Sequence, residues 1–202
     1  MHGYSTDSNE RRVVPFLLAA LAIALAWITS RLLAATHFSV PWWAGAPSSM
    51  GFYGALYMLF DKRLWRNRFI RKLGLVRVPN MTGRWRGYLT SSFDAHVKQR
   101  EVKIQIFQTW TQISISLSTA TSLSRSCVAA IQVGDPDYTT LIYQYDNQPQ
   151  ASSLKMMHMH YGTAMLRISN GSLLIGDYYA GPDRGTFGRI LCRKQWNAAK
   201  AA

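Results

Sequence analysis

The segment KMMHMHYGTA at 155–164 concentrates side chains that bind soft metal ions. Its two histidines, His158 and His160, would share one face of a β-strand, and three methionines surround them. Histidine and methionine can both ligate Cu(I). However, no third imidazole, carboxylate or thiolate stands at a supporting spacing, and methionine is more often an adaptable packing residue. We therefore expect a β-strand here and no metal site.

The chain also lacks the patterns that would indicate catalysis. It holds ten acidic residues with no evident general acid–base pair, and no GxSxG, HExxH or P-loop motif. Its two cysteines, Cys127 and Cys192, are far apart and indicate neither a disulfide framework nor a zinc site. We expect a protein that is not an enzyme and has no cofactor. The net charge of +13 predicts an acidic partner such as anionic lipid, nucleic acid or a phosphorylated small molecule.

Residues 1–60 are predicted to form a two-helix transmembrane hairpin. Residues 13–30 are uncharged over 18 positions, close to the length that spans a bilayer. A cleavable signal peptide is the alternative, but the segment is long for one and no small-x-small cleavage site follows directly. A second uncharged run at 38–60 predicts a return helix over about 42–60, with Trp42 and Trp43 at the membrane interface. Its glycines (Gly45, Gly51 and Gly54) would allow close helix approach, either between copies or within the hairpin.

The charges flanking the helices predict the orientation of the hairpin. Residues 61–77 hold seven Lys or Arg side chains and one Asp, a net +7 − 1 = +6, and Arg11 and Arg12 precede the first helix. The connecting loop offers only Arg31 and His37. The positive-inside rule therefore places both termini in the cytoplasm. The linker at 61–80 is basic and amphipathic, so we expect it on anionic headgroups rather than on DNA or RNA.

From residue 81 to 196 the hydrophobic period changes to two, which indicates β-strands. Alternation and turn signals predict eight strands, at about 83–90, 101–108, 113–119, 125–133, 139–147, 157–168, 172–180 and 186–194. The apolar parity changes between Ile106 and Ile113, which predicts a hairpin near 109–111. We expect an all-β, eight-stranded antiparallel up-and-down barrel, lipocalin-like, with a tail at 197–202; a two-sheet sandwich is the alternative.

One face of several predicted strands mixes hydroxyls, rings and an amide with apolar groups. A barrel interior built for stability alone would be Val, Ile and Leu, so this mixture favours a wet pocket for a polar ligand. The alternative is that the hydroxyl groups face solvent at strand ends.

Six stretches in order, GRWRGYL, IQIFQTWTQISISLST, TSLSRS, LIYQYDNQP, HYGTAML and GDYYAGPDRGTFGRI, follow the predicted membrane hairpin. In this order they resemble the two-transmembrane, β-barrel effector of CBASS antiphage systems. The resemblance implies that the cytosolic barrel binds a cyclic dinucleotide made by an associated cyclic nucleotide synthase. It further implies that the protein then forms homo-oligomers and disrupts the bacterial inner membrane, causing abortive infection.

The resemblance and strand parity together suggest which residues contact the ligand. Guanidinium groups would pair with phosphate and tyrosine rings would stack on bases, while hydroxyl, amide and imidazole groups would form hydrogen bonds. The candidates are Thr119, Ser124, Arg125, Ser126, Tyr143, Tyr145, Asn147, His160, Thr163, Tyr178, Arg184 and Thr186. A membrane-anchored, lipocalin-like carrier of an apolar molecule or lipid is the competing function.

Overall fold

The computed structural model describes residues 1–35, 45–135, 137–153, 158–182 and 184–195. The chain folds into two compact units. One is Ser8–Arg77, and the other combines Met1–Asp7 with the chain from Val78 onward. The first seven residues therefore belong to the second unit, although the sequence predicted them to be part of the membrane hairpin.

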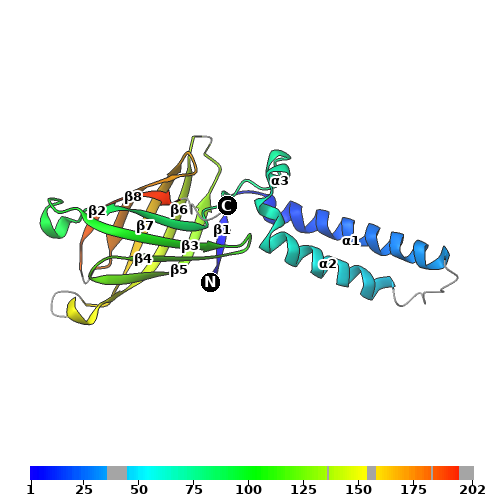
Figure 1. The fold of residues 1–202 in the computed structure, drawn as a ribbon, viewed down its shortest axis with the longest axis horizontal. Helices are drawn as coiled ribbons and strands as arrows, with labels where there is room; N and C mark the ends of the chain where they lie inside the picture. The colour runs from blue at the N-terminus through cyan, green and yellow to red at the C-terminus, as the bar shows by residue number, and fades with distance from the viewer. Residues whose placement is uncertain (36–44, 136, 154–157, 183, 196–202) are drawn as a thin grey trace, which may run out of the picture. The chain divides into compact units, whose positions relative to one another are not determined.

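The smaller unit is a pair of contacting helices, α1 (Glu10–Ala35) and α2 (Gly45–Lys62) (Figure 1). A stripe of residues four positions apart on α1 is buried: Val14, Leu18, Ala22 and Ala26. Large apolar side chains on the rest of α1 are exposed, including Phe16 and Leu32 at 76% and 66%. A helix of 26 residues is about 39 Å long, enough to cross a bilayer. Exposed apolar residues around a helix of this length indicate that lipid covers it.

The predicted linker at 61–80 contains short helical turns. α2 continues to Lys62, and two short helical turns follow, η2 (Leu64–Arg66) and α3 (Arg68–Lys72). Trp65 is fully buried, so it does not face a membrane surface, whereas Phe69 and Leu73 are at least 72% exposed. The buried Glu10 accepts a hydrogen bond from the Arg77 backbone N–H at 2.7 Å, which joins the beginning and end of this unit.

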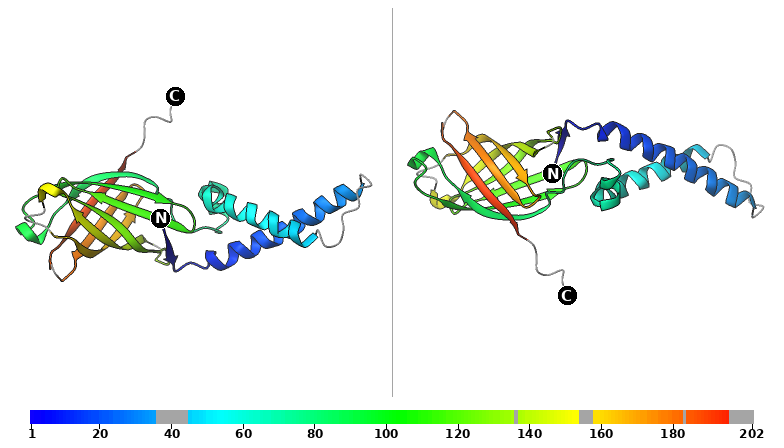
Figure 2. Two further views of the ribbon diagram at one scale, coloured as in Figure 1. Left: turned by 90° about the horizontal axis from the view of Figure 1, so that it is seen from below. Right: turned by 90° about the horizontal axis from the view of Figure 1, so that it is seen from above.

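The larger unit is a closed barrel of nine strands in the order β1-β4-β3-β2-β9-β8-β7-β6-β5, with β4 and β5 also paired directly (Figures 1 and 2). The strands are β1 (His2–Thr6), β2 (Gly83–Leu89), β3 (Arg100–Gln108), β4 (Gln112–Ser118), β5 (Ser122–Gln132), β6 (Thr139–Pro149), β7 (His160–Ser169), β8 (Leu173–Ala180) and β9 (Phe187–Gln195). The up-and-down antiparallel order from β2 to β9 confirms the predicted barrel, and the predicted hairpin lies at 109–112.

The ninth strand, β1, is the main departure from the sequence prediction. It fills the gap where β4 and β5 separate, pairing antiparallel with β4 and parallel with β5. Tyr4 is buried and donates a 2.7 Å hydrogen bond to the Trp110 carbonyl. The Ser126 hydroxyl links β5 to both neighbouring strands at the place where β4 and β5 separate. It lies 2.7 Å from His2 Nε2 of β1 and accepts a hydrogen bond from the Ile115 N–H of β4 at 3.0 Å.

Two details of strand parity also differ. A bulge between Ser126 and Val128 leaves Val128 exposed and Ala129 buried, so the strict alternation expected of a strand is interrupted in β5. β7 begins at His160 rather than near residue 157, so His158 is not a strand residue opposite a partner. Lys155, Met156 and Met157 lie outside the described residues.

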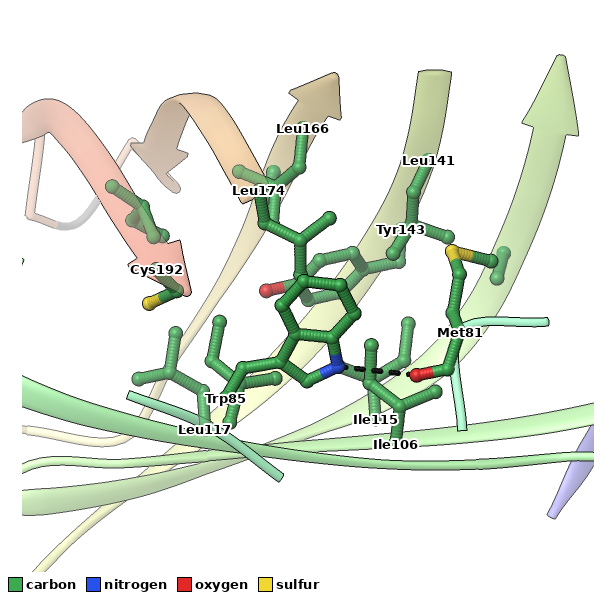
Figure 3. Packing of buried hydrophobic residues seen from close by; sticks show 14 of the residues in the cluster. Met81, Trp85, Ile106, Ile115, Leu117, Leu141, Tyr143, Leu166, Leu174 and Cys192 are labelled. Atoms are coloured by element: carbon green, nitrogen blue, oxygen red, sulfur yellow. Dashed lines mark hydrogen bonds between the residues drawn. The ribbon is translucent and has the colours of Figure 1, made fainter. Parts of the chain in front are cut away.

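One end of the barrel is filled with large apolar side chains (Figure 3). Trp85 is 1% exposed and its indole N–H donates to the Met81 carbonyl at 3.1 Å. The ring lies among aliphatic residues from several strands, including Ile106, Leu141 and Leu174. Cys192 is buried in the same cluster, and burial raises the pKa of its thiol to about 12. Among the described residues, this end of the barrel is therefore closely packed around Trp85.

Asp7 fastens the chain at the solid end and provides a pH-dependent test. Its carboxylate accepts hydrogen bonds from the N–H groups of Val133 and Gly134 at 2.8 and 2.9 Å, and the Val133 bond lowers the pKa of Asp7. A lowered folded-state pKa contributes stability above the unfolded value of about 3.9, and this stability is lost as pH falls through the folded value. We expect Asp7→Ala to lower barrel stability by about 1 kcal/mol at pH 7.

The difference in stability between wild type and Asp7→Ala should become smaller when thermal melts are repeated below about pH 4. Asp7→Asn is the matched control, because it keeps an acceptor oxygen and should lose less stability. A stability difference between wild type and Asp7→Ala that does not change with pH would mean that the ionised Asp7 carboxylate does not stabilise the barrel.

Candidate functional site

The open end of the barrel holds a cavity of about 270 Å³. Its walls come from the ends of β2, β4, β6 and β8 and the beginnings of β3, β5, β7 and β9, which all meet at this end. The loop that carries η3 (Ser92–Asp94) lies at the same end, far left in Figure 1, whereas β1 lies at the other end of the barrel. An antiparallel barrel brings such strand ends together around one mouth.

Most of the residues predicted to contact a ligand line this cavity. They share inward strand positions or positions in the turns of the mouth. They are Thr119, Ser124, Tyr143, Tyr145, Asn147, His160, Tyr178, Arg184 and Thr186.

Three predicted residues do not line it. Arg125 is the fourth residue of β5, not its end, and points outward between Ser124 and Ser126. Ser126 lies where β4 and β5 separate, and its hydroxyl contacts His2 of β1 and Ile115 of β4. Thr163 is exposed because the buried positions on β7 are the even-numbered ones, Gly162 to Ile168. Arg125, Ser126 and Thr163 therefore do not face this cavity.

Several lining residues were not predicted. The missed polar residues are Ser91, Arg100, Thr121, Ser122 and Ser153, and the missed apolar ones are Leu89, Phe93, Leu117 and Ile190. Thr121 and Ser122 belong to the same turn as Thr119, so the break between the predicted strands 113–119 and 125–133 was the available signal. Ser91 and Phe93 lie in a nonperiodic segment that carried no such signal.

The polar groups in the wall are partly occupied by one another. Ser124 and Asn147 are cross-strand neighbours, and the buried Ser124 hydroxyl donates to Asn147 Oδ1 at 2.8 Å. The Thr119 hydroxyl oxygen accepts from the N–H groups of Thr121 and Ser122 at 3.2 and 3.1 Å, which orders the turn. These contacts fix donors and acceptors on the wall before a ligand arrives, which lowers the entropic cost of binding.

Two tyrosines form the aromatic side of the cavity. The ring centroids of Tyr143 and Tyr145 are 6.2 Å apart and the rings are tilted by 54°. Burial raises the pKa of both phenols, with a further increase for Tyr145 from Tyr178 and a smaller opposing effect from Arg184. Both therefore stay neutral and can stack on a base or donate a hydrogen bond.

Two arginines line the mouth of the cavity, Arg100 from β3 and Arg184 from the turn between β8 and β9. The Arg100 guanidinium lies 2.6 Å from Asp94 Oδ2. The Arg184 guanidinium lies over the Phe93 ring, 5.8 Å from its centroid. The rim is thus cationic above an aromatic and hydroxyl-lined wall, which suits a ligand with bases and negative charge.

The histidine segment shows no sign of metal binding in the part of the chain that is described. His160 Nδ1 lies 3.0 Å from the carbonyl oxygen of His158, two residues earlier in the chain. Among the described residues there is no group of three His, Cys, Asp or Glu side chains that could hold an ion. His160 is instead a lining residue of the cavity.

Comparison with known proteins matches both units of the chain. Residues 76–194 match a family model described as the Cap15 cyclic dinucleotide receptor domain, and residues 12–66 match one described as the Cap15 TM helices. CD-NTase-associated protein 15 from Yersinia aleksiciae is 33% identical to the chain over 149 residues, which cover 71% of the chain and 67% of that protein. The chain therefore belongs to the Cap15 family of CBASS membrane effectors, with a β barrel preceded by membrane helices.

Proposed function

We propose that this protein binds a cyclic dinucleotide in the mouth of its barrel. The observation that carries the proposal is the cavity itself, which joins tyrosine rings, a Ser–Asn pair and two rim arginines in a domain of the Cap15 receptor type. Aromatic rings suit the bases, and guanidinium groups suit the two phosphates. The messenger would come from an associated cyclic nucleotide synthase, in keeping with the name of the Yersinia relative.

We also propose that the hairpin crosses the bacterial inner membrane twice, with both chain termini and the barrel in the cytoplasm. The position of β1 supports this topology independently of charge. Because β1 and β2–β9 form one barrel, the chain enters and leaves the intervening segment 8–77 on the same side of the membrane. If α1 spans, the chain must therefore return, and α2 is the helix available. The +6 segment at 61–77 favours the cytoplasmic side and contact with anionic lipid.

Ligand binding then promotes assembly of several copies, and their helices disrupt the membrane. The ligand must bind the assembled state more tightly, since equal affinity for both states would shift nothing. Only three residues separate β1 from α1, so a change in the barrel reaches the first helix through a short connection.

The direct test places the full-length protein in vesicles of phosphatidylethanolamine and phosphatidylglycerol loaded with a self-quenching dye. A cyclic dinucleotide that binds should release the dye, and crosslinking should show assemblies at the same ligand concentration. Binding without assembly or leakage would overturn the assembly part of the proposal. No binding to any member of a cyclic dinucleotide panel would overturn the receptor part.

Gly51 and Gly54 on α2 provide a prediction about assembly. Both have open space where a Cβ atom would stand, so they do not serve close packing against α1. Small residues on an outward helix face allow close approach of a helix from another copy. We expect Gly51→Leu/Gly54→Leu to reduce ligand-induced leakage at least tenfold with unchanged ligand affinity. Met50→Leu, on an exposed position of the same helix, is the matched control and should leak normally.

A further inference from the structure

The loop between β2 and β3, residues 90–99, lies at the open end of the barrel and contacts Phe187 of β9. The Ser92 hydroxyl accepts a 3.0 Å hydrogen bond from the Phe187 N–H, and the His96 ring lies 5.6 Å from the Phe187 ring. Ala95 and His96 both have positive φ, at 52° and 64°, and the His96 N–H donates to the Ser91 carbonyl at 2.8 Å. Two consecutive non-glycine residues with positive φ are uncommon, and this conformation persists only where surrounding contacts hold it. The loop is therefore a fixed part of the rim.

This loop contacts both arginines of the mouth through adjacent residues. Asp94 pairs with Arg100 at 2.6 Å, and Phe93 lies beneath the Arg184 guanidinium. The Asp94 side chain is 15% exposed, and its second oxygen, Oδ1, is buried with no hydrogen-bond partner in the described part of the chain. The Arg100 ion pair is therefore the main charge compensation that the structure gives Asp94.

The two arginines are far apart in the sequence, and different interactions orient their side chains. Arg100 is oriented by a charged hydrogen bond, which uses one edge of its guanidinium and leaves other N–H groups for a ligand. Arg184 is oriented by a ring face, which leaves all five of its N–H donors unoccupied by that contact. Both side chains line the cavity, so both groups can reach an anion in it.

We propose that Arg100 and Arg184 each bind one phosphate of the ligand, and that Phe93 and Asp94 are positioning residues that hold the two guanidinium groups for it. This inference rests on the proposed function. A cyclic dinucleotide carries two phosphodiester anions, and two arginines that line one cavity supply one guanidinium group for each.

The test is isothermal titration of the full-length protein with the cyclic dinucleotide that binds wild type most tightly. Charge-assisted hydrogen bonds to phosphate predict that Arg100→Ala and Arg184→Ala each weaken binding about 10- to 100-fold. The double variant should also lose most of the salt dependence of the affinity. Arg125→Ala, an exposed arginine on the outer wall, is the matched control and should bind as wild type does.

Double-mutant cycles separate positioning from general damage to the loop. Asp94→Asn should weaken binding about 3- to 10-fold in the wild-type background and have no effect once Arg100 is alanine. Phe93→Leu should weaken binding in the wild-type background and have no effect once Arg184 is alanine. Phe93→Tyr, which keeps the ring, should bind with wild-type affinity. If wild type binds a cyclic dinucleotide and the arginine variants bind equally well, this inference is wrong and the receptor function stands. If wild type binds none, the proposed function itself fails.

Discussion

Deletion of residues 2–6 is expected to abolish the cooperative unfolding of the barrel. Those residues form β1, and without it β4 and β5 lose the strand that pairs with both of them at the solid end. The deletion also removes the buried Tyr4 ring and its hydrogen bond to Trp110. Loss of a buried aromatic side chain alone costs about 3–5 kcal/mol, and a small domain has only about 5–15 kcal/mol in total.

The deletion is measured by near-ultraviolet circular dichroism and hydrogen exchange of the full-length protein in detergent micelles. Exchange should become fast in β4 and β5 first, since their edges are exposed. Tyr4→Phe is the control, because it keeps the ring and loses only the hydroxyl bond, at a cost of about 1 kcal/mol. A deletion variant that melts within a few degrees of wild type would mean that β1 is not part of the barrel.

Replacing Trp85 with alanine is expected to destabilise the barrel by about 3–5 kcal/mol. The indole is almost completely buried at the solid end, and the surrounding strands are closed and cannot collapse easily into the space. The Met81 carbonyl would also lose its N–H donor. Urea unfolding of the full chain should show a lower midpoint with a similar slope.

Trp85→Phe is the matched variant and should lose less, because the ring still fills most of the volume. Trp85 does not line the cavity, so the alanine variant should keep its ligand affinity wherever it remains folded. A loss below 1 kcal/mol for Trp85→Ala would contradict the description of this end as a packed plug.

The sequence predicted the regular part of the fold because alternation of apolar and polar residues is a local signal. Strands such as Arg100–Gln108 and Gln112–Ser118 carry that alternation along their whole length. β1 has five residues, HGYST, with one buried side chain, and its partners are more than 100 positions away. Nothing local distinguishes such a segment from a polar tail before a membrane helix.

The site was predictable where it followed strand parity and not where it depended on irregular structure. Tyr143, Tyr145 and Asn147 alternate on one strand and all line the cavity, as expected. The bulge after Ser126 reverses parity, and a bulge has no reliable sequence signal. Arg100 is the first residue of β3, one position before the predicted strand 101–108, and its partner Asp94 belongs to an irregular loop whose Ser92 contacts Phe187 of β9.

Thermal melting of the full-length protein with a panel of cyclic dinucleotides decides whether the barrel is a receptor for them. The full chain is required because residues 78–202 alone lack β1. A ligand at about one hundred times its dissociation constant should stabilise the barrel by about 2.7 kcal/mol. We predict a clear rise in melting temperature for one or two cyclic dinucleotides and none for fatty acids. Stabilisation by fatty acids and by no cyclic dinucleotide would exclude the receptor function and favour a carrier of apolar molecules.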